Sequence, residues 1–90
     1  MANVRRHLWV SGRVQGVLFR GTCAREAQTL GVAGWVRNTQ DGAVEVVAEG
    51  DEEVVAKFID WCHKGPPSAW VTHVDVEEEL PQGLQGFIVR

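Results

Sequence analysis

The sequence carries no excess of positive charge: nine Lys and Arg residues stand against twelve Asp and Glu residues, and the net charge is -3. A chain with this balance has no general electrostatic attraction for nucleic acid or for anionic lipid. It also lacks the Lys/Arg-Gly-Phe-Gly-Phe type of run that stacks RNA bases on an open sheet. We therefore expect neither nucleic acid nor a membrane as a partner, and any anion site must be local.

Long apolar runs are absent as well. No segment approaches the roughly 20 apolar residues of a membrane span, and the first residues lack the apolar core, about 7–15 residues long, of a secretory signal. Ninety residues, 44% of them hydrophobic, suffice for one modest core. These features predict a single domain over residues 1–90 that acts as a monomer in the cytoplasm.

The spacings of metal-binding and redox motifs are missing. Cys23 and Cys62 are too far apart for a CxxC motif, and His7, His63 and His73 form neither an HxH nor an HExxH pattern. The two cysteines fall on apolar stripes of expected helices, which favours buried free thiols over a disulfide or a reactive thiol. We expect no metal and no cofactor.

What the sequence does contain is an alternation of strand and helix patterns. Strands are expected at residues 6–12, 34–39, 43–49, 70–78 and 86–90. Helices are expected at about residues 21–30 and 51–63. An Asp-Gly turn at residues 41–42 joins the second and third strands into an antiparallel hairpin. This order predicts an α+β fold, the ferredoxin-like βαββαβ sandwich, with a mainly antiparallel sheet and both helices on one face.

The strand patterns also predict which side chains are solvated. In the expected third strand, apolar residues alternate with Glu45 and Glu49, which predicts that one face is wetter than the other. The three glutamates at residues 77–79 are expected to be a solvated strand end. Trp35 and Trp61 are expected to anchor the core, because each offers a large apolar area.

The most distinctive stretch is GRVQGVLFR at residues 12–20, which leaves the first strand and enters the first helix. A helix N-terminus carries partial positive charge and free N–H groups, so a cation there costs about 0.3–1 kcal/mol unless an anion joins it. Gly12 and Gly16 permit close backbone approach to a ligand, and consecutive N–H groups from Gln15 to Arg20 can form an anion nest. On spacing alone, an Arg20 paired with a surface carboxylate is an equally good interpretation.

A second candidate is Asn38, at the end of the expected second strand. Its side chain is suited to bonding its own turn backbone, which is the ordinary role of asparagine before a hairpin turn. The alternative is that the amide orients a water molecule. An amide has no useful proton affinity, so it cannot serve as a general base.

Together these residues resemble the two signature motifs of the acylphosphatases. GRVQGVLFR at 12–20 is followed by GWVRN at 34–38, GAV at 42–44 and Gly50, in the order and at the spacing of that family. The GPP stretch at 65–67 and the ending at 87–90 resemble the family too, so the match spans nearly the whole chain.

The resemblance implies hydrolysis of the carboxyl-phosphate bond of acyl phosphates, without metal or covalent intermediate, on a ferredoxin-like fold. It assigns phosphate binding to Arg20 and positioning of the attacking water to Asn38. It also brings the last residue, Arg90, near the active arginine. The phosphate-binding residues that it implies are Gln15, Gly16, Val17, Leu18, Phe19 and Arg20.

This chemistry needs no catalytic His or Asp. An acyl phosphate leaves as a carboxylate whose conjugate acid has a pKa of about 4, so its leaving oxygen requires no general acid at pH 7. The remaining tasks are to place a water in line and to stabilise charge on the phosphoryl oxygens. Two alternatives stay open: a non-catalytic ferredoxin-like module that binds a phosphorylated ligand, and one domain of a larger maturation protein.

Overall fold

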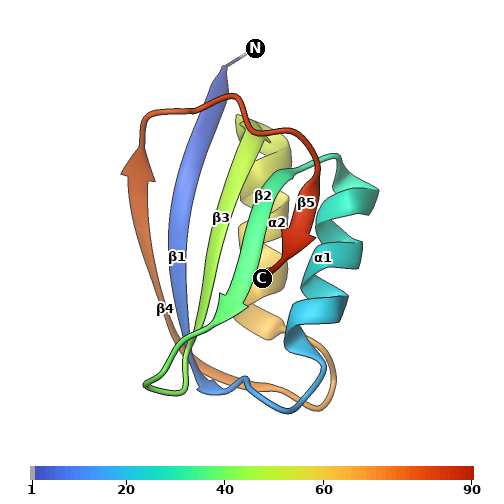
Figure 1. Ribbon diagram of the computed structural model, residues 1–90, viewed down its shortest axis with the longest axis vertical. Coiled ribbons are helices and arrows are strands. Elements are labelled where there is room, and N and C mark those ends of the chain that lie inside the picture. Colours follow the sequence, from blue (N-terminus) through green and yellow to red (C-terminus); the bar gives the residue numbers. More distant parts are fainter. Residues whose placement is uncertain (1) are drawn as a thin grey trace.

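A computed structural model describes residues 2–90, which form a five-stranded sheet covered on one face by two helices (Figure 1). The elements in chain order are β1 (Asn3–Arg13), α1 (Phe19–Leu30), β2 (Ala33–Asn38), β3 (Val44–Asp51), α2 (Glu52–Lys64), β4 (Trp70–Glu79) and β5 (Phe87–Val89). The strand order is β4-β1-β3-β2-β5, and only the β2–β5 pair is parallel. The predicted ferredoxin-like α+β fold is confirmed. Within residues 2–90, neither helix is long and apolar enough to span a membrane.

The two helices begin in different ways. In α2 the side chain of Asp51 accepts a hydrogen bond from the N–H of Glu53 at 3.2 Å, and acidic residues occupy the first turn, as helix capping requires. Helix α1 begins at Phe19 rather than at residue 21, with neither a side-chain cap nor an acidic residue in its first turn. The positive end of α1 is therefore left without an anionic side chain of its own.

The core lies between the sheet and the helices. Alternate residues of β1 and β3 supply fully buried side chains, and each helix adds an apolar stripe that includes one cysteine. Cys23 and Cys62 are both free and buried, as predicted. Burial and a hydrogen bond with Cys62 raise the pKa of the Cys23 thiol well above its ordinary value. A protonated thiol is a poor nucleophile, which agrees with the predicted structural role.

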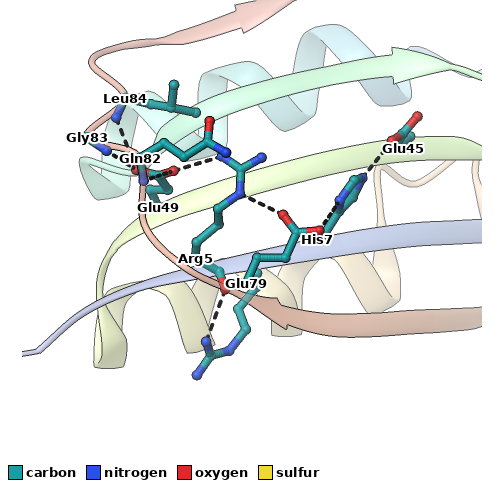
Figure 2. A network of polar contacts seen from close by, with 9 residues as sticks. Arg5, His7, Glu45, Glu49, Glu79, Gln82, Gly83 and Leu84 are labelled. Atoms are coloured by element: carbon teal, nitrogen blue, oxygen red, sulfur yellow. Dashed lines mark hydrogen bonds and ion pairs between the residues drawn. The ribbon is translucent and has the colours of Figure 1, made fainter.

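The sheet face opposite the helices departs from expectation, because Glu45 and Glu49 are buried, with 7% and 4% of their surface exposed. Figure 2 shows why: Arg5 donates to Glu49 at 2.8 Å and to Glu79 at 2.7 Å, and the His7 ring lies between Glu79 and Glu45. The prediction of a wetter face was wrong. The prediction of a solvated strand end is confirmed for Glu77 and Glu78, whereas Glu79 is partly exposed and pairs with Arg5 and His7. Alternation along one strand does not reveal that a neighbouring strand supplies cationic partners.

Trp35 also lies on this face, half-buried, so the prediction that it anchors the core was wrong. Its ring stands edge-on to the His7 ring, 5.9 Å between centroids, and under the guanidinium of Arg90, 4.5 Å from the centroid. Trp61 packs against the edge of the core, 5.4 Å from Phe19 between ring centroids. Trp35 therefore holds the end of the chain, whereas Trp61 braces the start of α1.

Glu49 holds the segment that connects β4 to β5 across the end of the sheet (Figures 1 and 2). Its carboxylate accepts hydrogen bonds from the N–H groups of Gln82, Gly83 and Leu84 at 3.0, 3.0 and 3.1 Å. Burial opposes ionisation of Glu49, but hydrogen bonds from Arg5 and from the main chain outweigh it and hold its pKa below the ordinary value of 4.5. The ionised form is the one that the fold stabilises.

Replacing Glu49 with glutamine is expected to lower the free energy of unfolding at pH 7 by about 3 kcal/mol, because it breaks a buried ion pair and leaves Arg5 with Glu79 as its one carboxylate partner. A carboxyl whose pKa is lower in the folded protein stabilises the fold above its unfolded value of 4.5, and this stabilisation is lost as pH falls through the folded value. The stability of the native protein should therefore fall below about pH 4.5, and that of the variant should fall less steeply.

Urea unfolding at several pH values measures both effects. Glu77→Gln is the matched control, because Glu77 is an exposed glutamate on β4. Equal pH dependence of the native protein and Glu49→Gln would contradict the assignment of this stability to Glu49.

Candidate active site

The loop between β1 and α1 has an unusual backbone. Gly16 and Leu18 adopt positive φ angles, 73° and 67°, whereas Val17 between them does not. Among residues 2–90, Leu18 is the only non-glycine residue with a positive φ, a conformation that costs about 1–3 kcal/mol. Alternating signs of φ turn successive N–H groups toward one side, which is the geometry of an anion-binding nest.

The N–H groups of this loop are available to a ligand. The first helical hydrogen bond of α1 runs from the N–H of Thr22 to the carbonyl oxygen of Leu18 at 3.2 Å. Between residues 15 and 21, no main-chain N–H donates to another atom of residues 2–90. Because the macrodipole of α1 adds partial positive charge at the same place, these N–H groups have the arrangement of a backbone anion site.

The loop is held rigidly on both sides. The side-chain amide of Gln15 donates to the carbonyl oxygens of Thr39 and Ala43, each at 2.8 Å. On the other side, the hydroxyl of Ser68 donates to the carbonyl oxygen of Val17 at 2.8 Å. Gln15 thus ties the loop to the β2–β3 hairpin. A preorganised loop of this kind loses little conformational entropy when an anion binds.

The loop encloses a pocket of about 360 Å³ together with the ends of β2 and β5. The lining residues are Val14, Gly16, Leu18, Phe19, Arg20, Gly21, Asn38 and Val89. Two members of the predicted phosphate-binding set, Gln15 and Val17, are not among them. The Gln15 side chain is turned to the hairpin, and Val17 is buried in the core.

Gly12 also has a different place from the one expected. It lies within β1, at the register shift that follows Ser11, rather than in the loop. A Cβ at Gly12 would lie 2.2 Å from the carbonyl oxygen of Trp70. Gly12 therefore allows β1 and β4 to approach each other, and it does not line the pocket as the sequence led us to expect.

Among residues 2–90, Arg20 is the only charged residue that lines the pocket. It forms no ion pair with an Asp or Glu side chain of residues 2–90, so the interpretation that such a carboxylate neutralises it was wrong. Its Nη1 atom donates to the main-chain oxygen of Arg90 at 3.4 Å. The guanidinium therefore has most of its hydrogen-bonding capacity left for a ligand.

Asn38 faces this pocket from the last position of β2. Its Oδ1 atom is buried and has no hydrogen-bond partner within residues 2–90. The hairpin turn is closed by Thr39, which exchanges hydrogen bonds with Ala43, so the interpretation of Asn38 as a turn residue was wrong. A buried acceptor is costly unless a donor reaches it, and this one lies in the same pocket as Arg20, where a water molecule or a ligand can supply that donor.

Gly34 and Arg90 set the position of the pocket's outer strands. A Cβ at Gly34 would lie 1.8 Å from the carbonyl oxygen of Val47, so only glycine lets β2 approach β3 this closely. The N–H of Arg90 donates to the carbonyl oxygen of Val36 at 2.8 Å. The expected proximity of Arg90 to Arg20 is confirmed by the hydrogen bond between them.

Sequence reasoning missed three lining residues, Val14, Gly21 and Val89. The sequence did point to the strand that contains Val89, because residues 87–90 belong to the part of the chain that resembles the acylphosphatases. Which residue of that strand faces the pocket follows from the parallel pairing of Val89 with Val36, and such pairing between strands far apart in sequence is not evident from local patterns.

Comparison with known proteins identifies the family. The acylphosphatase family model matches residues 6–89. The chain belongs to the acylphosphatase family. The acylphosphatase of Thermococcus kodakarensis is 58% identical over 89 residues, covering 99% of this chain and 98% of that relative.

Solved acylphosphatase structures have the same fold. An acylphosphatase from Coxiella burnetii is 39% identical with a TM-score of 0.94, and the match covers 98% of this chain and 93% of the other. An acylphosphatase from Bacillus subtilis is 38% identical with a TM-score of 0.94, covering 97% and 98%. The resemblance found in the sequence is therefore confirmed along nearly the whole chain.

Proposed function

We propose that this acylphosphatase-family chain holds the phosphoryl group of an acyl phosphate with loop residues 16–20 and the Arg20 guanidinium, while Asn38 positions the attacking water. Membership of the family supports the reaction itself, hydrolysis of the carboxyl-phosphate bond to carboxylate and inorganic phosphate, and does not favour a non-catalytic binding module. The observation that carries the assignment of roles is the unpaired, buried Asn38 Oδ1 in the same pocket as Arg20.

Phosphate binding uses two kinds of donor. The free N–H groups of the loop and of the first turn of α1 converge on one anion, and the planar fork of Arg20 matches two phosphoryl oxygens. Phosphoryl transfer spreads negative charge over the equatorial oxygens in the transition state. Fixed donors at these oxygens stabilise that charge without reorganisation, by about 3–4 kcal/mol for a strong donor.

Asn38 supplies the other half of the reaction. Its Oδ1 can accept a hydrogen bond only from a donor that enters the pocket, and water is such a donor. The amide orients that water without taking its proton. This suffices because the leaving carboxylate is a weak base, and the loose transition state demands little nucleophilic activation. The proposed mechanism therefore involves no metal, cofactor or covalent enzyme intermediate.

We further propose that the protein acts as a monomer on a free small-molecule acyl phosphate in the cytoplasm, as the sequence predicts.

The proposed function is tested by release of inorganic phosphate from acetyl phosphate and from benzoyl phosphate in the presence of excess EDTA. We expect turnover that EDTA does not reduce, and competitive inhibition by inorganic phosphate, because substrate and product share the phosphate site. Phosphate binding in a calorimeter without turnover of either substrate would instead support a binding module. Turnover that EDTA abolishes and Mg²⁺ restores would contradict the metal-independent mechanism.

A further inference from the structure

The pocket has a polar part and an apolar part. Its polar groups are Arg20, Asn38 and the loop N–H groups, all of which the proposed mechanism assigns to the phosphoryl group and the water. The other side chains that line it are apolar: Val14, Leu18, Phe19 and Val89. Within the described residues, no further charged or hydrogen-bonding side chain lines this pocket, so none is left there for the acyl group of the substrate.

Two of the apolar side chains are accessible to that group. Val14 and Phe19 are each 1% exposed and form part of the core, whereas Leu18 is 80% exposed and Val89 is 48% exposed. Leu18 comes from the loop and Val89 from β5, so they approach the pocket from separate elements.

The exposure of Leu18 comes at a cost to the fold. A large apolar residue gains nothing from water and also bears the strain of a positive φ, which glycine or asparagine adopts more easily. Neither local conformation nor core packing explains leucine at this position. An apolar ligand group that covers the side chain does explain it, because burial of that surface is favourable only when the ligand is bound.

We infer that Leu18 and Val89 form a subsite for the acyl group, and that the preferred substrates are acyl phosphates with an apolar aromatic or branched acyl group. This inference rests on the proposed function, because it places the acyl group beside a phosphoryl group already held by the loop. A small acyl group reaches little of this surface, and a charged one finds no partner in the pocket.

The test compares kcat/KM for benzoyl phosphate with kcat/KM for acetyl phosphate, expressed as a ratio. Leu18→Asn removes the apolar surface but keeps a residue that tolerates positive φ. Val89→Thr replaces a methyl group with a hydroxyl at nearly constant shape. We expect the native protein to prefer benzoyl phosphate, and Leu18→Asn to lower the ratio by about fivefold to tenfold, with a smaller decrease for Val89→Thr.

The ratio is the appropriate measure because the Leu18 backbone belongs to the phosphate loop. Any change in binding of the phosphoryl group changes kcat/KM for both substrates equally, so it cancels in the ratio. Leu80→Asn and Ile88→Thr are matched controls, since Leu80 and Ile88 are 85% and 56% exposed but do not line the pocket, and they should leave the ratio unchanged. An unchanged ratio in both pocket variants, or a native preference for acetyl phosphate, would overturn the subsite. Failure to hydrolyse either substrate would instead overturn the proposed function, and the subsite with it.

Discussion

Replacing Asn38 with alanine is expected to lower kcat for acyl phosphate hydrolysis by about 100-fold to 1,000-fold, while inorganic phosphate inhibits the residual activity with unchanged affinity. In the proposed mechanism, the loop and Arg20 hold the phosphoryl group, and Asn38 holds only the water. Steady-state kinetics at saturating substrate, with phosphate as competitor, measure both quantities.

The stability of this variant provides an independent check. Asn38 Oδ1 has no hydrogen-bond partner within residues 2–90, so its removal breaks no bond of the fold. Urea unfolding should therefore show Asn38→Ala to be at least as stable as the native protein, in contrast to the loss of a structural asparagine. Asn3→Ala, at an exposed position of β1, serves as the control and should retain full activity. Native turnover by Asn38→Ala would refute the assigned role.

Replacing Arg20 with alanine is expected to lower kcat/KM by at least about 1,000-fold and to abolish inhibition by millimolar phosphate, because the variant loses the one charged residue that residues 2–90 contribute to the pocket. Lysine at this position should restore only part of the activity, since it supplies charge without the planar fork that binds two oxygens. Kinetics of the two variants, together with phosphate titration, distinguish charge from geometry.

The same substitution should stabilise the fold. A cation at the N-terminus of α1 opposes the macrodipole, and its removal is expected to raise the free energy of unfolding by about 0.3–1 kcal/mol at low salt. Arg25→Ala, an exposed position later in the same helix, is the matched control and should leave activity intact. If Arg20→Ala retained phosphate inhibition, Arg20 would not be the phosphate ligand.

The sequence predicted the elements well because their signals are local. Asp51 before a run of acidic residues marks the start of α2, and the Asp-Gly turn at residues 41–42 marks the hairpin. The start of α1 was placed too late because Phe19 follows a residue with positive φ, which no propensity favours for leucine. The error thus falls where the local conformation is strained, in the proposed site.

The candidate site was only partly predictable from residues alone. Arg20 and Asn38 were identified, but spacing did not decide between binding and structural roles for either of them. That decision requires the three-dimensional structure. Within residues 2–90, no Asp or Glu side chain pairs with Arg20, and no hydrogen-bond donor reaches Asn38 Oδ1. Likewise, Glu45 and Glu49 were expected on a wet face because their cationic partners, Arg5, His7 and Arg37, come from the neighbouring strands β1 and β2.

Hydrogen bonds between residues far apart in the sequence determine when the pocket forms during folding. Arg20 and Arg90, which share a hydrogen bond, are 70 residues apart, and Arg5 and Glu79 are 74 residues apart. Such distant contacts form only after a large loss of chain entropy, so the pocket does not exist in a partly folded chain. A phosphate ion that binds this pocket therefore binds the native state alone, and by mass action it shifts the folding equilibrium toward the active protein.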